Sequence, residues 1–231
     1  MKKIALIISM VALFAGAGNA QQRTFNYGLK LGPNVGWAAP GSTASDGGHA
    51  RLGFALGGIV DINYTNHFGL STGLNLNFMK MDYQFTDFRM ATDFIEEVKV
   101  PVDRRFKGTY LELPIKIKAK ADVADSWKAF VEAGLGFSYN LADKGKDTYN
   151  DPFGHPYKDE KYKDYSYQYR LIQTALNFGI GAQYEISHNL NVFAQLTFNH
   201  ALSNTFTRDI KEQSGSIIRT NFIGLEIGII N

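Results

Sequence analysis

The 231-residue sequence contains no cysteine, which excludes a disulfide framework, a zinc–thiolate site and a cysteine nucleophile. It also lacks an apolar run of membrane-spanning length at its start, because the run Ile4–Ala17 is too short to cross a bilayer as a helix. Runs of helix-forming residues are few as well. What remains to organise the chain is its content of aromatic residues and glycine, and the alternation of polarity along it.

The N-terminus has the features of a secretory signal peptide. Two lysines follow Met1, an apolar run continues to Ala17, and a small-residue cleavage site ends at Ala20. We expect residues 1–20 to be cleaved and residues 21–231 to form a single domain. Loss of the two lysines reduces the 24 basic residues to equal the 22 acidic ones, and a neutral chain gives no basis for nucleic-acid binding.

The composition indicates an all-β chain, since it includes 12 tyrosines, 17 phenylalanines and 23 glycines. The segment Thr109–Lys120 shows the governing pattern most clearly, because its positions are alternately apolar and polar. The apolar set is Leu111, Leu113, Ile115, Ile117 and Ala119, and the polar set includes Glu112, Lys116, Lys118 and Lys120. A period of two residues predicts a strand with one apolar and one polar face.

Seven further segments alternate in the same way, so we predict eight strands. Together with 109–120 they are 25–37, 51–64, 68–78, 129–141, 172–186, 190–198 and 219–229. Long connections (39–50, 86–107, 142–166 and 203–216) alternate with short ones (65–67, 121–128 and 187–189). These features predict an eight-stranded antiparallel up-and-down transmembrane β-barrel of the outer-membrane type, with both termini in the periplasm of a Gram-negative bacterium.

The alternative fold is a soluble lipocalin-like barrel or a β-sandwich. A soluble barrel would carry Lys, Glu, Thr and Ser on its outer face, whereas the polar face here consists mostly of glycine, asparagine and serine. Small polar residues suit the crowded interior of a narrow barrel. The apolar face is therefore expected to meet lipid, and aromatic residues near strand ends are candidates for an interfacial girdle: Trp37, Tyr64, Tyr139 and Tyr184.

Charged residues on the polar strand faces are expected to meet inside the barrel. This lumen charge network comprises Lys30, Asp61, Glu112, Lys116, Lys118, Glu132, Glu185 and Glu226. Charges in a narrow lumen must be paired or hydrated, so the structural interpretation is a set of salt bridges that fixes strand register. The functional alternative is a narrow, largely plugged channel whose lining these charges tune. Side chains nearly fill an eight-stranded barrel, so free passage of solutes is not expected.

Two of the long connections combine charged and apolar residues. In 86–107, Val98, Val100 and Val102 accompany several charged residues, which predicts that the adjoining strands extend above the membrane as a hairpin. In 142–166, acids and bases are interleaved with four tyrosines, Tyr149, Tyr157, Tyr162 and Tyr165. Such a loop can contact other envelope or secretion proteins, although a solvated loop is the simpler interpretation.

Four segments resemble the PorT-like outer-membrane β-barrel family. They are FNYGLKLGPNVGW (25–37), TYLELPIKIKAK (109–120), FVEAGLGFSYNL (130–141) and FIGLEIGII (222–230). The resemblance extends over the mature chain, and YLELP is its most distinctive part. It implies a small eight-stranded outer-membrane barrel and, through the family's namesake, a connection to the type IX secretion machinery. The C-terminus departs from barrels of this class, because it ends on Ile229-Ile230-Asn231 and lacks a terminal aromatic residue.

A lipid A-modifying hydrolase is a further hypothesis. The segment 199–204 is similar to the His-x-Ser-Asn segment of the lipid A deacylase family with one residue inserted, which places His200 and Ser203 on opposite faces of a strand. Only a bulge at Ala201–Leu202 would bring them together. The nearest downstream acids, Asp209 and Glu212, fall in an expected loop. Metal-ligand spacing is absent among the remaining histidines, His49, His67, His155 and His188.

The sequence therefore predicts a barrel without enzymatic activity and without a cofactor or metal. Its expected partners are outer-membrane lipid and, through 142–166, other envelope or secretion proteins. The expected role is that of a structural or interaction component of the cell envelope, with a narrow channel as the alternative.

Overall fold

The computed structural model describes residues 24–90, 97–151, 153–187 and 190–231. The expected signal peptide, Met1–Ala20, and His188 lie outside these ranges. The long strands are β1 (Thr24–Pro40), β2 (Ser45–Asn63), β3 (Phe68–Met90), β4 (Glu97–Ala124), β5 (Trp127–Asn150), β8 (Ile172–Ser187), β9 (Leu190–Ala201) and β10 (Ile218–Ile230). The shorter elements are β6 (Pro156–Lys158), β7 (Lys163–Asp164), the 3-10 helix η1 (Ser166–Gln168) and α2 (Arg208–Ser214).

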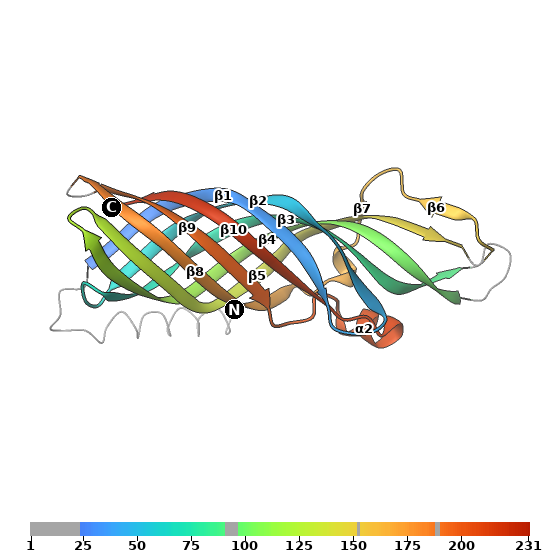
Figure 1. Ribbon diagram of the computed structural model, residues 1–231. Helices are drawn as coiled ribbons and strands as arrows, with labels where there is room; N and C mark the ends of the chain where they lie inside the picture. Colours follow the sequence, from blue (N-terminus) through green and yellow to red (C-terminus); the bar gives the residue numbers. More distant parts are fainter. Residues whose placement is uncertain (1–23, 91–96, 152, 188–189) are drawn as a thin grey trace.

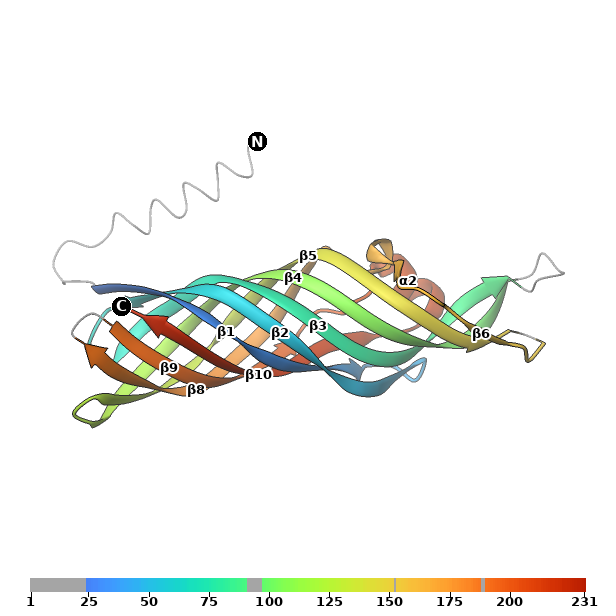
Figure 2. The same ribbon diagram turned by 90° about the horizontal axis from the view of Figure 1, so that it is seen from above.

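The long strands form a closed antiparallel ring, which confirms the predicted eight-stranded barrel. Their order is β4-β3-β2-β1-β10-β9-β8-β5, and the ring closes where β4 pairs with β5. Figures 1 and 2 show the strands inclined around a common axis. Tight turns join β2 to β3 and β4 to β5 at the end where β1 begins and β10 ends. We call this end of the barrel the turn end.

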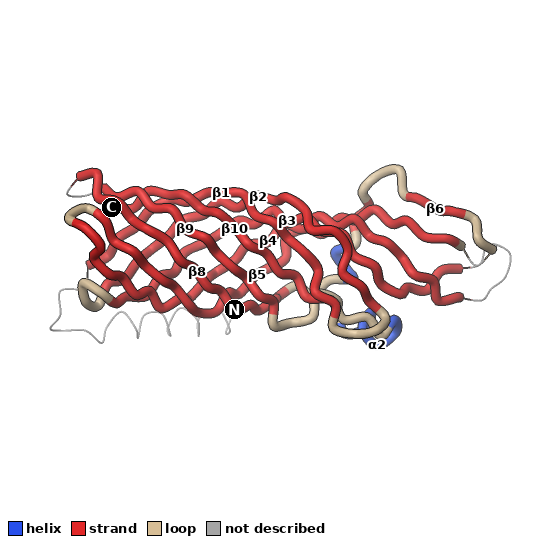
Figure 3. Tube along the Cα trace, in the orientation of Figure 1, coloured by secondary structure: helices blue, strands red, loops and turns tan. Residues whose placement is uncertain are grey.

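Strands β3, β4 and β5 run beyond the others at the opposite end of the barrel, where Figure 3 shows strands continuing past the closed ring. We call this end the extended end. There β3, β4 and β5 continue as a sheet, and β6 and β7 pair with β5. We define the extension as the described residues within 79–108 and 142–170. The predicted hairpin above the barrel is therefore present, because the register of β3 and β4 continues as far as Met90 opposite Glu97.

Three of the predicted long loops are shorter or more structured than expected. The segment 142–166 is not one loop, because β5 continues to Asn150 and β6 and β7 follow it. The connection predicted at 39–50 shrinks to the residues between Pro40 and Ser45, and that at 203–216 contains helix α2. In 39–50 and 142–166 backbone hydrogen bonds continue past the point where lipid-type alternation stops, so the loss of that alternation was wrongly interpreted as the end of a strand.

The alternation of polarity inverts along β4 while the strand itself continues. In the barrel, Leu111, Leu113, Ile115 and Ile117 face outward and are 37–67% exposed, whereas Glu112, Lys116 and Lys118 are buried. In the extension the buried positions include Val100, Val102 and Phe106, and the exposed ones are Lys99, Pro101, Asp103, Arg105 and Lys107. An apolar outside suits lipid and an apolar inside suits water, so the edge of the bilayer lies near Gly108–Tyr110.

Apolar side chains close the interior at two levels. The larger cluster lies at the extended end and includes Met81, Phe85, Phe106, Tyr169 and Phe206. The smaller cluster lies toward the turn end and consists of Ile59, Phe130, Phe193 and Ile230. Much of the polar lumen therefore lies between two apolar layers, while Asp61 and Lys120 also line the cavity at the turn end. Among the described residues, no helix is long and apolar enough to cross a membrane.

Candidate functional site: the charged lumen and the extension

The structure buries seven of the eight residues of the predicted lumen charge network. Lys30, Asp61, Glu112, Lys116, Lys118, Glu132 and Glu226 are each at most 7% exposed. They reach the lumen from β1, β2, β4, β5 and β10, because each occupies an inward position of its strand. The alternation of these strands is therefore what gathers the charges.

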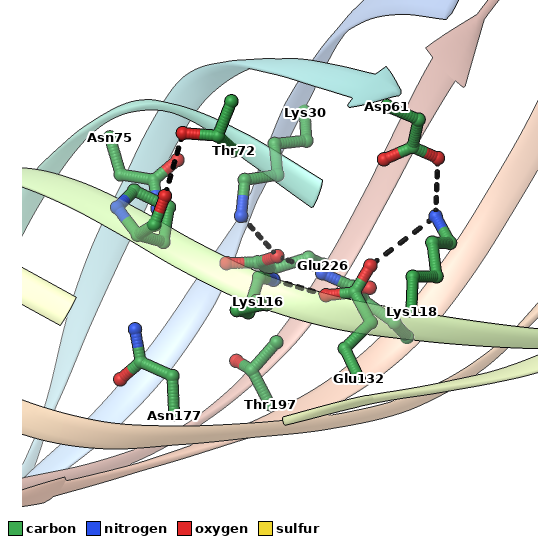
Figure 4. Close-up of polar contacts among 12 residues, drawn as sticks. Lys30, Asp61, Thr72, Asn75, Lys116, Lys118, Glu132, Asn177, Thr197 and Glu226 are labelled. Atoms are coloured by element: carbon green, nitrogen blue, oxygen red, sulfur yellow. Dashed lines mark hydrogen bonds and ion pairs between the residues drawn. The ribbon is translucent and has the colours of Figure 1, made fainter. Parts of the chain in front are cut away.

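The buried charges form ion pairs between adjacent strands or between strands separated by one other strand (Figure 4). Lys30 Nζ lies 2.8 Å from Glu226 Oε2, and Lys118 Nζ lies 2.8 Å from Asp61 Oδ2. Lys116 donates to Glu132, and Lys118 approaches the other oxygen of Glu132 at 3.3 Å. Glu132 is therefore shared by two lysines, and each lysine of the network has a carboxylate partner.

Glu112 is satisfied by amides and has no ion pair among the described residues. Asn77 Nδ2 donates to Glu112 Oε2 at 2.8 Å, and Asn177 Nδ2 donates to Oε1 at 2.7 Å. Longer bonds come from Asn75 at 3.4 Å and Asn199 at 3.3 Å. Such donors stabilise a buried carboxylate without adding charge.

A glycine makes room for this arrangement. A Cβ atom at Gly136 would lie 2.4 Å from Glu112 Oε1 and 2.6 Å from Asn177 Nδ2, which is closer than real Cβ contacts allow. The sequence indicated small residues on the lumen face, but it did not show that this one borders a carboxylate.

Glu185 does not belong to the buried network, so that prediction is wrong. Its side chain is exposed, and it lines a cavity of 240 Å³ at the turn end, together with Asn63, Thr65, Lys120 and Lys128. Alternation gives Glu185 an inward position, but β8 ends two residues later. The residue therefore reaches the mouth of the barrel, where water can hydrate the carboxylate.

Several members of the lumen network were not predicted. Lys120 Nζ lies 3.6 Å from Asp61 Oδ2 and donates to Asn63 Oδ1 at 2.8 Å. Gln195 Nε2 donates to Glu226 Oε2 at 2.5 Å. Lys120 and Gln195 stand on polar faces of their strands, so alternation could have identified both. Their partners depend on the register between strands, which alternation does not give.

The four predicted girdle aromatics lie at two levels. Tyr64 and Tyr184 lie at the turn end and are 43% and 38% exposed. Trp37 and Tyr139 lie toward the extended end, where Trp37 is half-buried against Phe198 and Tyr139 is 46% exposed. These positions match aromatic belts at the two edges of a lipid-facing band. The prediction omitted Trp127, which is 49% exposed with its ring centroid 4.9 Å from that of Tyr184.

The four tyrosines of the candidate partner loop have different environments. Tyr157 is 41% exposed, and its ring centroid lies 4.7 Å from that of the half-buried Tyr149. Tyr162 is half-buried, with Lys107 Nζ 4.0 Å from its ring centroid. Tyr165 is only 7% exposed and belongs to the apolar cluster of the extension. Its inclusion in a partner surface is therefore wrong.

Arg104 is the centre of the extension, although the sequence placed it in a loop. Its guanidinium is 3.8 Å from the ring centroid of Tyr165, and Nε and Nη2 donate to the two carboxylate oxygens of Asp147 at 2.6 and 2.8 Å. Nη1 donates to Tyr169 Oη at 3.1 Å and to Gln168. Burial lowers the pKa of Arg104, but Tyr169 and Asp147 outweigh it, so the pKa stays well above its usual value.

Asp143 lies in the extension just beyond the outward-facing Leu141. It is fully buried, and it accepts hydrogen bonds from Asn140 Nδ2 and, at 3.2 Å, from Tyr110 Oη. Burial raises the pKa of Asp143 to about 7, because it outweighs the two hydrogen bonds that lower the pKa. The carboxyl group is therefore partly protonated at neutral pH, which reduces the charge held beside the apolar cluster.

The residues of the hydrolase hypothesis do not come together. His200 is half-buried, and its ring centroid lies 6.4 Å from that of the outward-facing Phe198. The Ser203 hydroxyl accepts a hydrogen bond from the Thr174 backbone N–H at 3.2 Å, and Glu212 accepts one from Arg208. No hydrogen bond joins His200 to Ser203, both of which are described. Among all the residues that the structure describes, no group of three or more His, Asp or Glu side chains could hold a metal ion.

A comparison with protein-family models agrees with the barrel architecture. The family model described as "Outer membrane protein beta-barrel domain" matches residues 19–207. Neisserial surface protein A has a TM-score of 0.45 and 10% identity, over 91% of this chain and 98% of that protein. Ail, the attachment invasion locus protein of Yersinia pestis, has a TM-score of 0.39 and 13% identity, over 89% and 98%.

The outer membrane protease OmpT of Escherichia coli is also similar, with a TM-score of 0.38 and 10% identity, over 92% of this chain and 98% of that protein. Similarity at this level carries no information on activity. No curated protein matched the chain.

Proposed function

The chain belongs to the outer membrane protein β-barrel domain family, and from this premise we propose that it is a non-conducting, non-catalytic membrane anchor that presents its extension to other envelope components. The observation that carries the proposal is the contrast between the two parts of the molecule. The lumen holds charges that are paired with one another or, for Glu112, bound by amides, whereas the extension offers a large structured surface.

The filled lumen supports the non-conducting part of this proposal. Between the asparagines around Glu112 and the apolar cluster, the cavity bordered by Asn77, Met79 and Tyr110 has a volume of 20 Å³. That volume holds about one water molecule. Toward the turn end, Lys118 Nζ lies 4.2 Å from the ring centroid of Phe130, so a lumen charge is directly covered by the smaller apolar cluster.

Conductance in planar bilayers tests the closed lumen. We expect no discrete current steps from the refolded wild-type protein, because ion pairs and two apolar clusters occupy the lumen in the described ranges. The closed lumen would be contradicted if the wild type shows current steps whose size or ion preference changes in Lys116→Gln. The matched variant Lys128→Gln, at the mouth, should then leave those steps unchanged. Lys116 is buried, while the Lys128 side chain is 43% exposed. Comparing the two variants therefore distinguishes an effect in the lumen from one at the mouth of the barrel.

The orientation in the membrane is also part of the proposal. We place the turn end in the periplasm and the extension outside the cell, because outer-membrane barrels have short periplasmic turns and longer outward segments. The inward apolar core of the extension and its charged outer face support a position in water. With this orientation, both ends of the mature chain are periplasmic.

Single cysteine variants test the orientation, because the chain has no other thiol. Lys161→Cys in the extension should react with a membrane-impermeant maleimide on intact cells. Asp125→Cys, which is also exposed but at the turn end, should react only after the outer membrane is permeabilised. The reverse pattern would overturn the proposed orientation and, with it, presentation at the cell surface.

A connection to protein secretion is the finer proposal. It is supported by the segments that resemble the PorT-like family. The most distinctive of these segments is YLELP, residues 110–114 in β4. The same Lys161→Cys position can carry a cross-linker. Capture of a component of the type IX secretion machinery would support the connection, and normal secretion by cells that lack this protein would count against it.

A further inference from the structure

Three lysines lie side by side on the outer face of the extension, one on each of β3, β4 and β5. The strand register places Lys80 opposite Lys107, and Lys107 opposite Lys144. All three side chains are exposed. Like charges directly opposite one another on neighbouring strands destabilise a sheet. The row therefore has a cost in stability that an external anion would offset.

Carboxylates in the described ranges compensate this row only in part, through Asp164 beside Lys144. No ion pair within the described residues involves Lys80, Lys107 or Lys144. Asp164 stands opposite Lys144, and its carboxylate accepts a hydrogen bond from the Ser166 backbone N–H at 2.9 Å. That hydrogen bond lowers the pKa of Asp164, and the charge of Lys144 also helps to lower it, although these two described side chains form no ion pair. The ammonium of Lys107 instead lies over the ring of Tyr162, an aromatic contact that leaves its charge in place.

A second row, one outward position farther along the strands, adds more positive charge. In this row Asp82 stands opposite Arg105, and Arg105 opposite Lys146. The Asp82 carboxylate lies 2.5 Å from Arg51 Nε and 3.9 Å from Arg105 Nε, so it is already engaged by Arg51. Arg105 is exposed. Its guanidinium is therefore available to an anion that the lysine row holds.

The row lies at the level where a bilayer presents its head groups. On the same strands, the next outward residues toward the turn end include Phe78 and Leu141, which are 37% and 50% exposed. These residues are the last apolar ones on the lipid-facing surface of their strands. Long lysine side chains at such an edge keep their ammonium groups in the polar layer, where lipid phosphates are the principal anions.

We propose that Lys80, Lys107 and Lys144, assisted by Arg105, bind the phosphate groups of an anionic lipid in the leaflet that surrounds the extended end. Adjacent strands are about 4.8 Å apart, so the row spans about 10 Å, enough for two phosphates on one head group. Each ammonium offers three donors and a full positive charge, which suits phosphate oxygens. The site is independent of whether the lumen conducts and of any protein partner.

Lipid binding by the full-length mature chain in a neutral detergent tests the proposal. The probe is diphosphorylated lipid A, titrated against the protein and counted by native mass spectrometry. The variant carries Lys80→Gln, Lys107→Gln and Lys144→Gln. Each lysine near a charged surface contributes roughly fivefold in affinity, so we expect the triple variant to bind lipid A about a hundredfold more weakly than the wild type. The matched variant, with Lys99→Gln, Lys158→Gln and Lys161→Gln, loses the same charge elsewhere on the extension and should bind like the wild type.

Three results would overturn the proposal. They are equal affinity of the triple variant and the wild type, equal binding of lipid A from which both phosphates have been removed, and displacement of the lipid by an equal concentration of inorganic phosphate. The last result would identify a site for a free anion. Heat-dependent electrophoretic mobility shows whether each variant is folded. If the triple variant does not fold, the single variant Lys107→Gln carries the test, with about a fivefold loss expected.

Discussion

Replacing Glu132 with glutamine is expected to destabilise the barrel by about 3–5 kcal/mol, because it removes one partner from a buried ion-pair cluster. Glu132 is 2% exposed and receives both Lys116 and Lys118. Lys118 would keep Asp61, but Lys116 would lose the ion-pair partner that it has among the described residues. A buried ammonium without a carboxylate loses its compensation for desolvation, and a neutral amide supplies little of it.

Urea-induced unfolding of the barrel in detergent or lipid vesicles measures this effect. Glu185→Gln is the matched control, because it makes the same chemical change at the exposed mouth. It should alter the free energy of unfolding by no more than about 0.5 kcal/mol. Equal unfolding midpoints for Glu132→Gln and wild type would show that the lumen cluster does not hold the strands together.

Replacing Arg104 with methionine is expected to have an effect of similar size, about 3–5 kcal/mol, but confined to the extension. The substitution keeps much of the apolar stem and removes the guanidinium that binds Asp147 through both oxygens. Asp147 would then remain buried at 1% exposure beside an apolar cluster. Because Arg104 makes its contacts beyond the bilayer edge, the barrel should stay folded while the extension opens.

Hydrogen exchange resolved by segment distinguishes local from global opening. Protection should fall in β6, β7 and the outer parts of β3–β5, and should persist in β8–β10. Arg105→Met, at the next residue, is the control because its side chain is exposed, and it should leave protection unchanged. Joint replacement with Arg104→Met and Asp147→Leu should restore much of the protection, since it removes both charges. Loss of protection throughout the barrel would contradict a local role.

Alternation was sufficient to predict the barrel and most of its lumen charges, because strand period and inward position are local properties of the sequence. Glu185 was wrongly included for the same reason. Alternation gives the direction of a side chain but not its depth along the axis, and Glu185 stands where β8 ends at the turn-end mouth. Which lysine meets which acid also escaped prediction. Pairs such as Lys30 with Glu226 depend on register across strands that are 196 residues apart in sequence.

The extension was only partly predicted because its strands invert their polarity without ending. Val98, Val100 and Val102 carried a usable signal, and the hairpin of β3 and β4 followed from it. The continuation of β5 was hidden by a register shift opposite Thr109–Tyr110, after which the inward positions change from even to odd numbers. Arg104 was overlooked in consequence, since a charged residue in an expected loop gives no reason to assign it to a core.

The unbroken passage of β3, β4 and β5 from the turn end to the tip has a mechanical consequence. A partner that pulls on the extension along the barrel axis loads many backbone hydrogen bonds of the β3–β4 and β4–β5 ladders together, because these ladders run on into the barrel. The strands would have to slide past one another before any pair separates, and they cannot be peeled apart one bond at a time. Tension applied outside the membrane is therefore carried by the barrel wall into the bilayer, with no flexible joint between the described parts of these strands.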